Sequence, residues 1–296
     1  MLKKSIFWLL MLSFTLTLME SNTVITYLEY GLTLFLYSIF PTLFPILLIT
    51  DLIIKYNLAN FLIPWLSKIT KLLYKVEGYP ALIIFLSLLT GTPGNAKLIS
   101  NAYLDKHISK DTVNKLLWVT HSFNPMFLIA TVGVIYFNNI TFGITLLCTG
   151  ILTNIVIARF IKIDHKPTYL NQINNIHHSF NDIILSNFKT LILVAGIVII
   201  ATIFLGFITL LPFNLTTFIG LIEVTTGSKI ISVSSLPNLY QYLLTVIFFS
   251  FGSFSIIAQN ISIMGKIIDK KSYIQIRIIA SMISLIIFLI FYLLII

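Results

Sequence analysis

The stretch Leu88-Leu89-Thr90-Gly91-Thr92-Pro93-Gly94-Asn95-Ala96-Lys97-Leu98-Ile99-Ser100 decides how this chain is built. It interrupts a hydrophobic run with two glycines and a proline, and it then places the Asn95 amide and the Lys97 ammonium group at the depth of lipid. Irregular backbone survives at that depth only where protein or a water-filled cavity satisfies its polar groups. The pattern predicts a broken helix at a binding site. The alternative is a Gly/Pro-rich loop outside the membrane.

A weaker copy of this pattern lies in the second half of the chain, at 251–262, where the sequence reads Phe-Gly-Ser-Phe-Ser-Ile-Ile-Ala-Gln-Asn-Ile-Ser. Ala96-Lys97 in the first motif aligns with Ala258-Gln259 in the second. Broken helices at corresponding places in two halves of a chain mark the binding site of a transporter. We therefore predict an all-α polytopic membrane protein with two structural repeats, each containing a broken (re-entrant or discontinuous) helix.

The composition supports this class. Hydrophobic residues make up 57% of the 296 residues and charged residues only 10%, which excludes an ordinary soluble domain. The formal net charge of +9 comes from Lys and Arg residues that flank the apolar stretches. At these positions basic residues set the topology and contact anionic lipid, so no nucleic acid partner is expected. The sequence has no CxxC or HExxH pattern, so no metal or cofactor is expected, and the single Cys148 excludes an internal disulfide.

The chain divides into four predicted parts. Residues 1–30 form an N-terminal membrane helix and an outer loop, and 31–161 form the first repeat. Residues 162–187 form a cytoplasmic connection, because this is the longest polar stretch, and 188–296 form the second repeat.

Two local signals lie early in the first repeat. Pro41 and Pro45 are four residues apart and are expected to kink or split a helix over 31–54. Lysines alternate with Leu, Ile and Trp65 between Lys55 and Lys75, which is typical of a helix lying in the membrane surface.

Two further signals follow. Asn124-Pro125 predicts a second break at membrane depth. The apolar segments 116–137 and 141–161 are joined by Asn138-Asn139 alone, which predicts a helical hairpin with a very short turn.

Orientation follows from the basic residues near span ends, which favour the cytoplasmic side. Four basic clusters are placed there, and with them the N-terminus: Lys3/Lys4, Lys55 to Lys75, Arg159 to Lys189, and Lys266 to Arg277. Glu20, Glu29 and Asn138-Asn139 then fall outside.

Four motifs in this order resemble one family: Thr-Gly-x-Pro-x-x-Ala-Lys at 90–97, Asn124-Pro125-x-Phe127, Gly220-Leu221-x-Glu223-x-Thr225-x-Gly227, and Phe-Gly-Ser-Phe-Ser-x-x-Ala-Gln at 251–259. Together they are similar to the sporulation integral membrane protein YlbJ (SpoVV) family, a branch of the membrane proteins with a nucleoside-recognition (gate) domain. The resemblance runs from about Gly31 to the C-terminus. The chain departs from the family at three positions, Thr92, Ser253 and Ile257.

This resemblance implies a transporter-like fold and, for the sporulation branch, export of dipicolinate from mother cell to forespore. It implies the bacterial cytoplasmic membrane as the location, or the outer forespore membrane in a spore former. The departures leave open whether this member handles the same solute.

The substrate-binding candidates come from the predicted breaks, together with Glu223 in the mixed segment 213–236: Gly91, Pro93, Gly94, Asn95, Lys97, Asn124, Glu223, Gly252, Ser255 and Gln259. The glycines permit close backbone approach, and Pro93 ends the preceding half-helix. Half-helices starting near Asn95 and Ser255 would point positive N-termini into the breaks, which favours an anion. Lys97 either adds a full charge there or snorkels to the cytoplasmic interface with Lys106 and Lys110.

Two acidic residues need assignment. Glu223 is open between three roles: a carboxylate that couples an ion or proton, a salt-bridge partner of Lys97 or Lys229, and an exposed residue of an external surface helix. Asp51 is expected at the interface with Lys55 at i+4.

We expect a transporter of a small polar solute rather than an enzyme, because within the apolar spans the sequence lacks a catalytic constellation. An anionic aromatic dicarboxylate such as dipicolinate is preferred. The alternatives are a nucleoside or other solute of the gate family, and a non-transporting membrane assembly protein of sporulation. The expected partners are the solute and the lipid bilayer, with a coupling ion (H⁺ or Na⁺) and a homo-oligomer left open.

Overall fold

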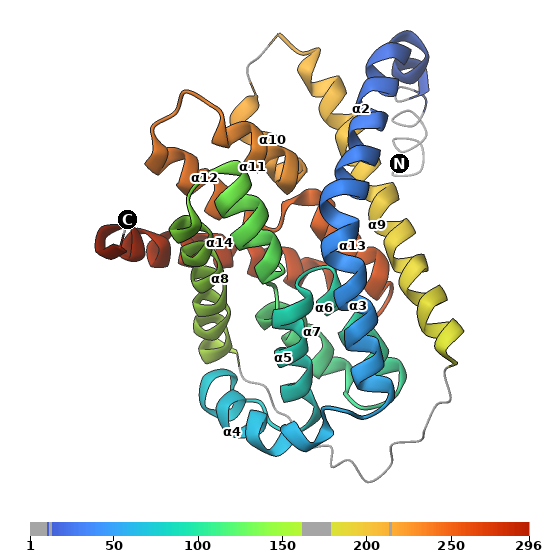
Figure 1. Ribbon diagram of the computed structural model, residues 1–296, viewed down its shortest axis with the longest axis vertical. Helices are drawn as coiled ribbons and strands as arrows, with labels where there is room; N and C mark the ends of the chain where they lie inside the picture. The colour runs from blue at the N-terminus through green and yellow to red at the C-terminus, as the bar shows by residue number, and fades with distance from the viewer. Residues whose placement is uncertain (1–10, 12–13, 162–178, 213–214, 296) are drawn as a thin grey trace.

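The fold is described from a computed structural model (Figure 1), over residues 11, 14–161, 179–212 and 215–295. Every regular element in these ranges is a helix. Five helical segments are long and apolar enough to span a bilayer: Ser21–Lys55, Ile140–Phe160, Phe180–Thr209, Asn238–Met264 and Lys270–Leu294. The predicted all-α polytopic membrane protein is confirmed. The basic N-terminus (Lys3, Lys4) and most of the predicted connection lie outside the described residues.

The first span is one long helical segment built from α2 (Ser21–Leu34), the π-helical η1 (Phe35–Ile39) and α3 (Phe40–Lys55). Pro41 and Pro45 fall in the first turns of α3 and do not split it; the Thr42 hydroxyl between them donates to the carbonyls of Ser38 and Ile39 (both 3.0 Å). Residues 21–30, predicted as part of an outer loop, are helical instead, since α2 packs lengthwise against α9 (Phe180–Thr209; Figure 1).

Helix α4 (Ile63–Tyr74) follows the short η2 (Asn60–Leu62) and is amphipathic, as predicted. Ile63, Leu66, Thr70 and Tyr74 are buried, whereas Trp65 on the other face is exposed. The chain then bends by 80° into α5 (Tyr79–Thr90).

Four helix breaks interrupt the rest of the chain, each at a motif singled out in the sequence. They separate α5 from α6 (Gly94–Leu104), α7 (Lys110–Val119) from the π-helical η3 (Phe127–Tyr136), α10 (Ile219–Ile222) from α11 (Val224–Ser232), and α12 (Asn238–Phe251) from α13 (Ser253–Met264). A short η4 (Thr216–Phe218) precedes α10, and α14 (Lys270–Ile295) ends the described chain.

The predicted hairpin is present between η3 and α8 (Ile140–Phe160). The Asn139 side chain caps α8 by accepting from the Phe142 amide at 3.0 Å. The turn can be short because Gly133 and Gly143 let the two backbones touch: a Cβ on Gly133 would lie 2.8 Å from the Gly143 Cα.

Helix α9 begins earlier than the predicted start of the second repeat. It starts at Phe180, where Ser179 and Asp182 form a reciprocal capping box, so the connection ends by Ser179 rather than at residue 187. Three apolar clusters hold the elements together, and the largest joins α4, α5, α6 and α7 to α13 and α14.

The α10–α11 break depends on glycine at one close approach. A Cβ on Gly227 would lie 2.0 Å from the Gly220 Cα, which is backbone and cannot move aside. We expect Gly227→Ala to lower the free energy of unfolding by about 1–3 kcal/mol, measured as thermal unfolding of the purified protein in detergent. Gly196→Ala in α9 is the matched control, because a Cβ there meets nothing within 4 Å. Equal stability of the two variants would contradict this packing.

Candidate functional site

Three of the four breaks line one cavity of about 50 Å³, and α13, which follows the fourth break, contributes Ile256 and Gln259. The cavity has room for a few water molecules. The residues of its wall come from both halves of the chain, and those from the first half include residues of α3. The residues that line it are Ile39, Thr42, Leu43, Thr90, Thr92, Pro93, Phe123, Asn124, Phe127, Val194, Val198, Glu223, Val224, Thr225, Ile256 and Gln259. The broken motifs of the two predicted repeats therefore face a common space.

The breaks also contact one another directly. The Thr92 hydroxyl and the Asn260 side-chain amide on α13 are hydrogen bonded, at 3.0–3.1 Å. Gly91 has a φ of +65°, and a Cβ there would lie 2.2 Å from the Asn124 amide nitrogen. Glycine is thus required twice over at Gly91, by its backbone conformation and by its contact with the Asn124 break.

Glu223 is the acidic group of this cavity. It is 1% exposed, and its carboxylate accepts from the backbone amides of Thr225 (3.1 Å) and Thr226 (2.6 Å), so it is the N-cap of α11. The helix N-terminus stabilises the negative charge. Among the described residues Glu223 forms no ion pair with a lysine or arginine, and its burial rules out the surface-helix interpretation.

Gln259 and Asn124 supply amide groups. Gln259 is 1% exposed, and its Oε1 is a buried acceptor that has no hydrogen-bond partner. A buried polar atom left without a partner is costly, so this oxygen is suited to a ligand or a water in the cavity. Asn124 is already engaged: its Oδ1 accepts from the Met126 amide (2.7 Å), and its Nδ2 donates to the Thr42 carbonyl (3.3 Å).

Lys97 does not line the cavity. It is 3% exposed, and its Nζ lies 2.6 Å from both Asp51 Oδ2 on α3 and Asn187 Oδ1 on α9. The Asn187 Nδ2 donates to the same Asp51 oxygen at 3.0 Å. Neither alternative for Lys97, a charge lining the solute site or snorkelling beside Lys106, describes this arrangement, because the triad is buried between α3, α6 and α9. The expected interfacial placement of Asp51 beside Lys55 is wrong for the same reason.

The remaining candidates lie behind the cavity wall: Gly91, Gly94, Asn95, Gly252 and Ser255. The Asn95 side chain donates to the carbonyl and hydroxyl of Thr120 (both 3.2 Å), which fixes α6 to the second break. A Cβ on Gly252 would lie 2.5 Å from the His121 ring. Of the ten candidates, Pro93, Asn124, Glu223 and Gln259 reach the cavity.

Sequence reasoning missed Asn187, which completes the Lys97–Asp51 contact. The available signal was an amide followed by an apolar run of spanning length in α9. Buried lysines and carboxylates in membrane proteins are usually paired, so Lys97 and Asp51 could also have been matched to each other. In the described part of the chain no group of three or more His, Cys, Asp or Glu residues is arranged to hold a metal ion.

Comparison with known proteins gives one informative result. No family model matches the chain, and no solved structure matches it at a significant level. The sporulation integral membrane protein YlbJ of Bacillus subtilis (strain 168) is 22% identical over 282 residues, covering 80% of this chain and 69% of the relative. The chain is therefore related to a membrane protein of sporulation, which confirms the resemblance drawn from the motifs.

The buried triad predicts a clear stability pattern. Lys97→Met or Asp51→Asn alone leaves one uncompensated buried charge, so each is expected to lower the free energy of unfolding by about 3–5 kcal/mol. The double variant removes both charges and should recover most of that loss. The measurement is the unfolding transition of the purified protein in detergent, monitored by circular dichroism.

The exposed pair Lys71–Glu77, at 3.0 Å, is the matched control. Glu77→Gln there should change stability by less than about 1 kcal/mol. Additive losses in the Lys97/Asp51 double variant would show that the two groups do not act as a pair.

Proposed function

We propose that this protein is a transporter that moves a small polar solute through the cavity lined by three of the breaks and by α13. The observation that carries the proposal is the convergence of helix breaks from both halves on one buried space, with the unpaired Gln259 Oε1 and the Glu223 carboxylate in its wall. Discontinuous helices around a central polar site are the usual arrangement in secondary transporters. The proposal includes no catalytic step.

Glu223 is proposed to couple transport to H⁺ or Na⁺. Its carboxylate is buried and lacks a cationic partner among the described residues, so a proton or a metal cation entering the cavity would neutralise it. Capping of α11 holds the carboxylate in place while it is occupied.

The proposed solute is an anionic aromatic dicarboxylate such as dipicolinate. The relative's role in sporulation supports this choice. A second candidate, a nucleoside, is favoured by one observation: Phe123 and Phe127 line the cavity beside the Asn124 and Gln259 amides, which suits ring stacking and base recognition. The proposed location is the bacterial cytoplasmic membrane, or the outer forespore membrane in a spore former.

Transport should depend on the cavity wall. In proteoliposomes, Gln259→Leu is expected to raise the KM for the transported solute by tenfold or more, about 1.4 kcal/mol, because a polar partner is lost.

Glu223→Gln should abolish the dependence of uptake on an H⁺ or Na⁺ gradient. Lys229→Gln on the same helix is the control, because Lys229 is exposed.

Uptake of labelled dipicolinate and of a labelled nucleoside, measured side by side, decides between the two solutes. If neither is carried and a non-transporting role in membrane assembly is correct, spore assembly should persist in the Gln259→Leu strain.

The proposed orientation places the N-terminus in the cytoplasm. Single cysteines at Lys68 on α4 and at Asn138 in the hairpin turn, both exposed, report on the two sides. In intact cells an impermeant thiol reagent should label Asn138→Cys and spare Lys68→Cys until the membrane is opened. The reverse pattern would invert the topology.

A further inference from the structure

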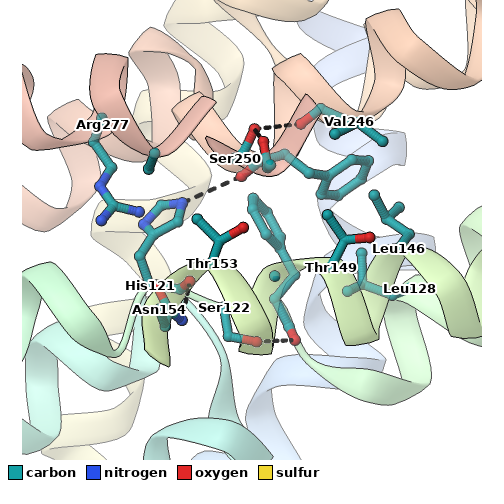
Figure 2. A pocket seen from close by; sticks show the side chains of 15 residues that line it. His121, Ser122, Leu128, Leu146, Thr149, Thr153, Asn154, Val246, Ser250 and Arg277 are labelled. Carbon is teal, nitrogen blue, oxygen red and sulfur yellow. Dashed lines mark hydrogen bonds between the residues drawn. The ribbon is translucent and has the colours of Figure 1, made fainter. Parts of the chain in front are cut away.

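A second cavity, of about 30 Å³, lies among α8, α12, α14 and the loop after α7 (Figure 2). Phe123 belongs to its wall and to that of the first cavity. The polar side chains around it are His121, Ser122, Thr149, Thr153, Asn154, Ser250, Arg277 and Ser284. Figure 2 shows the Arg277 guanidinium beside the His121 ring, at one end of this space.

Arg277 is a buried cation without an ionic partner. It is 1% exposed, lies within the spanning segment Lys270–Leu294, and forms no ion pair with any carboxylate in the described residues. The sequence assigned it to a cytoplasmic basic cluster, but its burial inside the bundle removes it from that surface.

The contacts of Arg277 leave part of its charge unmet. Its Nη2 donates to the Trp118 carbonyl at 2.6 Å, its guanidinium carbon lies 5.9 Å from the Tyr273 ring centroid, and its Nε has no partner. The Trp118 carbonyl belongs to the last turn of α7, whose C-terminus carries about half an elementary negative charge. This partial charge is too small to neutralise the full positive charge of Arg277.

Two threonine hydroxyls in the same cavity also lack hydrogen-bond partners. Thr149 and Thr153 lie one turn apart on α8, line this cavity, and have buried Oγ1 atoms without hydrogen-bond partners. The Nε of Arg277 and these two hydroxyls are three buried groups able to donate, gathered around one space. A buried group of this kind is expected to have a partner in the functional state.

We propose that this cavity is an anion subsite in which Arg277, assisted by Thr149 and Thr153, binds a carboxylate group of the solute. Arginine pairs with a carboxylate through parallel N–H donors, and the cavity has space for a group of about two water molecules. The inference rests on the proposed transport function and deepens it. In this proposal Arg277 binds the negative charge of the solute, whereas the charge of Lys97 is already neutralised by Asp51.

The first test is anion binding to the purified full chain. Dipicolinate and benzoate should raise the midpoint of thermal unfolding, whereas the uncharged dimethyl ester of dipicolinate should not. Arg277→Gln should weaken anion binding by at least about 30-fold, and Arg277→Lys should restore part of it. Lys229→Gln, which removes an exposed charge, is the control.

A purely structural Arg277, serving only the α7 C-terminus, predicts another result: Arg277→Gln would lower stability equally with and without the anion and leave the affinity unchanged. That outcome overturns the subsite, as does the failure of both carboxylates to stabilise the wild-type protein.

The second test keeps Arg277 intact, which covers the case in which its variants do not fold. Gly150→Cys places a thiol on the cavity wall, where an added Cβ meets nothing within 4 Å; Gly196→Cys on α9 is the matched control. In a Cys148→Ala background, dipicolinate should slow methanethiosulfonate labelling of Gly150→Cys by threefold or more and leave Gly196→Cys unchanged. Labelling unaffected by dipicolinate, or no labelling of Gly150→Cys, contradicts an anion-accessible cavity.

The two proposals fail separately. Anion binding that depends on Arg277 without any uptake in proteoliposomes removes the transport function and keeps the subsite. Uptake of the anion with an unchanged KM in Arg277→Gln keeps transport and removes the subsite.

Discussion

The structure depends on one constraint: backbone groups released by a helix break inside the membrane must find partners within the protein. Each of the four breaks meets it with a different device. Glu223 accepts from the amides that begin α11, and the Asn124 side chain accepts from the Met126 amide before η3. The Thr92 amide of the α5–α6 break donates to the Ser122 carbonyl, and the Phe249 carbonyl before the α12–α13 break is hydrogen bonded to the His121 ring. Because partners must come from protein rather than lipid, the breaks are drawn together at the centre. A central polar space is a direct consequence of that clustering.

The charges of this core are distributed unevenly, and the distribution gives each cavity its chemistry. Lys97 and Asp51 cancel one another with the help of Asn187, so this triad contributes rigidity and no net charge. Glu223 leaves one cavity negative, while Arg277 leaves the other positive. The proposed coupling cation would therefore bind at Glu223 in the first cavity, and a carboxylate group of the solute would bind at Arg277 in the second, with Phe123 in the wall of both.

The sequence predicted the class, three of the four breaks and the hairpin, because each is encoded locally by Gly, Pro or Asn within an apolar run. It did not predict the α10–α11 break at Glu223, and the split expected at Pro41 and Pro45 is absent from α3. It did not predict which polar residues meet, since that depends on packing between distant segments. Lys97 and Asn187 are 90 positions apart, and Arg277 reaches the Trp118 carbonyl across 159. The rule that basic residues mark the cytoplasmic side misplaced Arg277 for the same reason: it counts charges and does not see burial.

The relative strength of two contacts indicates where the cavity would open during transport. Separating Lys97 from Asp51 would leave two buried charges, at about 3–5 kcal/mol. Separating Thr92 from Asn260 breaks a neutral pair, worth about 0.5–1.5 kcal/mol. Lys97 ties α6 to α3 and α9, whereas Thr92 joins the α5–α6 break to α13. On the proposed transport function, α6 therefore stays fixed to α3 and α9, and the polar contact between the two broken helices is the weaker one. Gly252 at the α12–α13 break has a φ of +91° and lies against the His121 ring, so only glycine fits there.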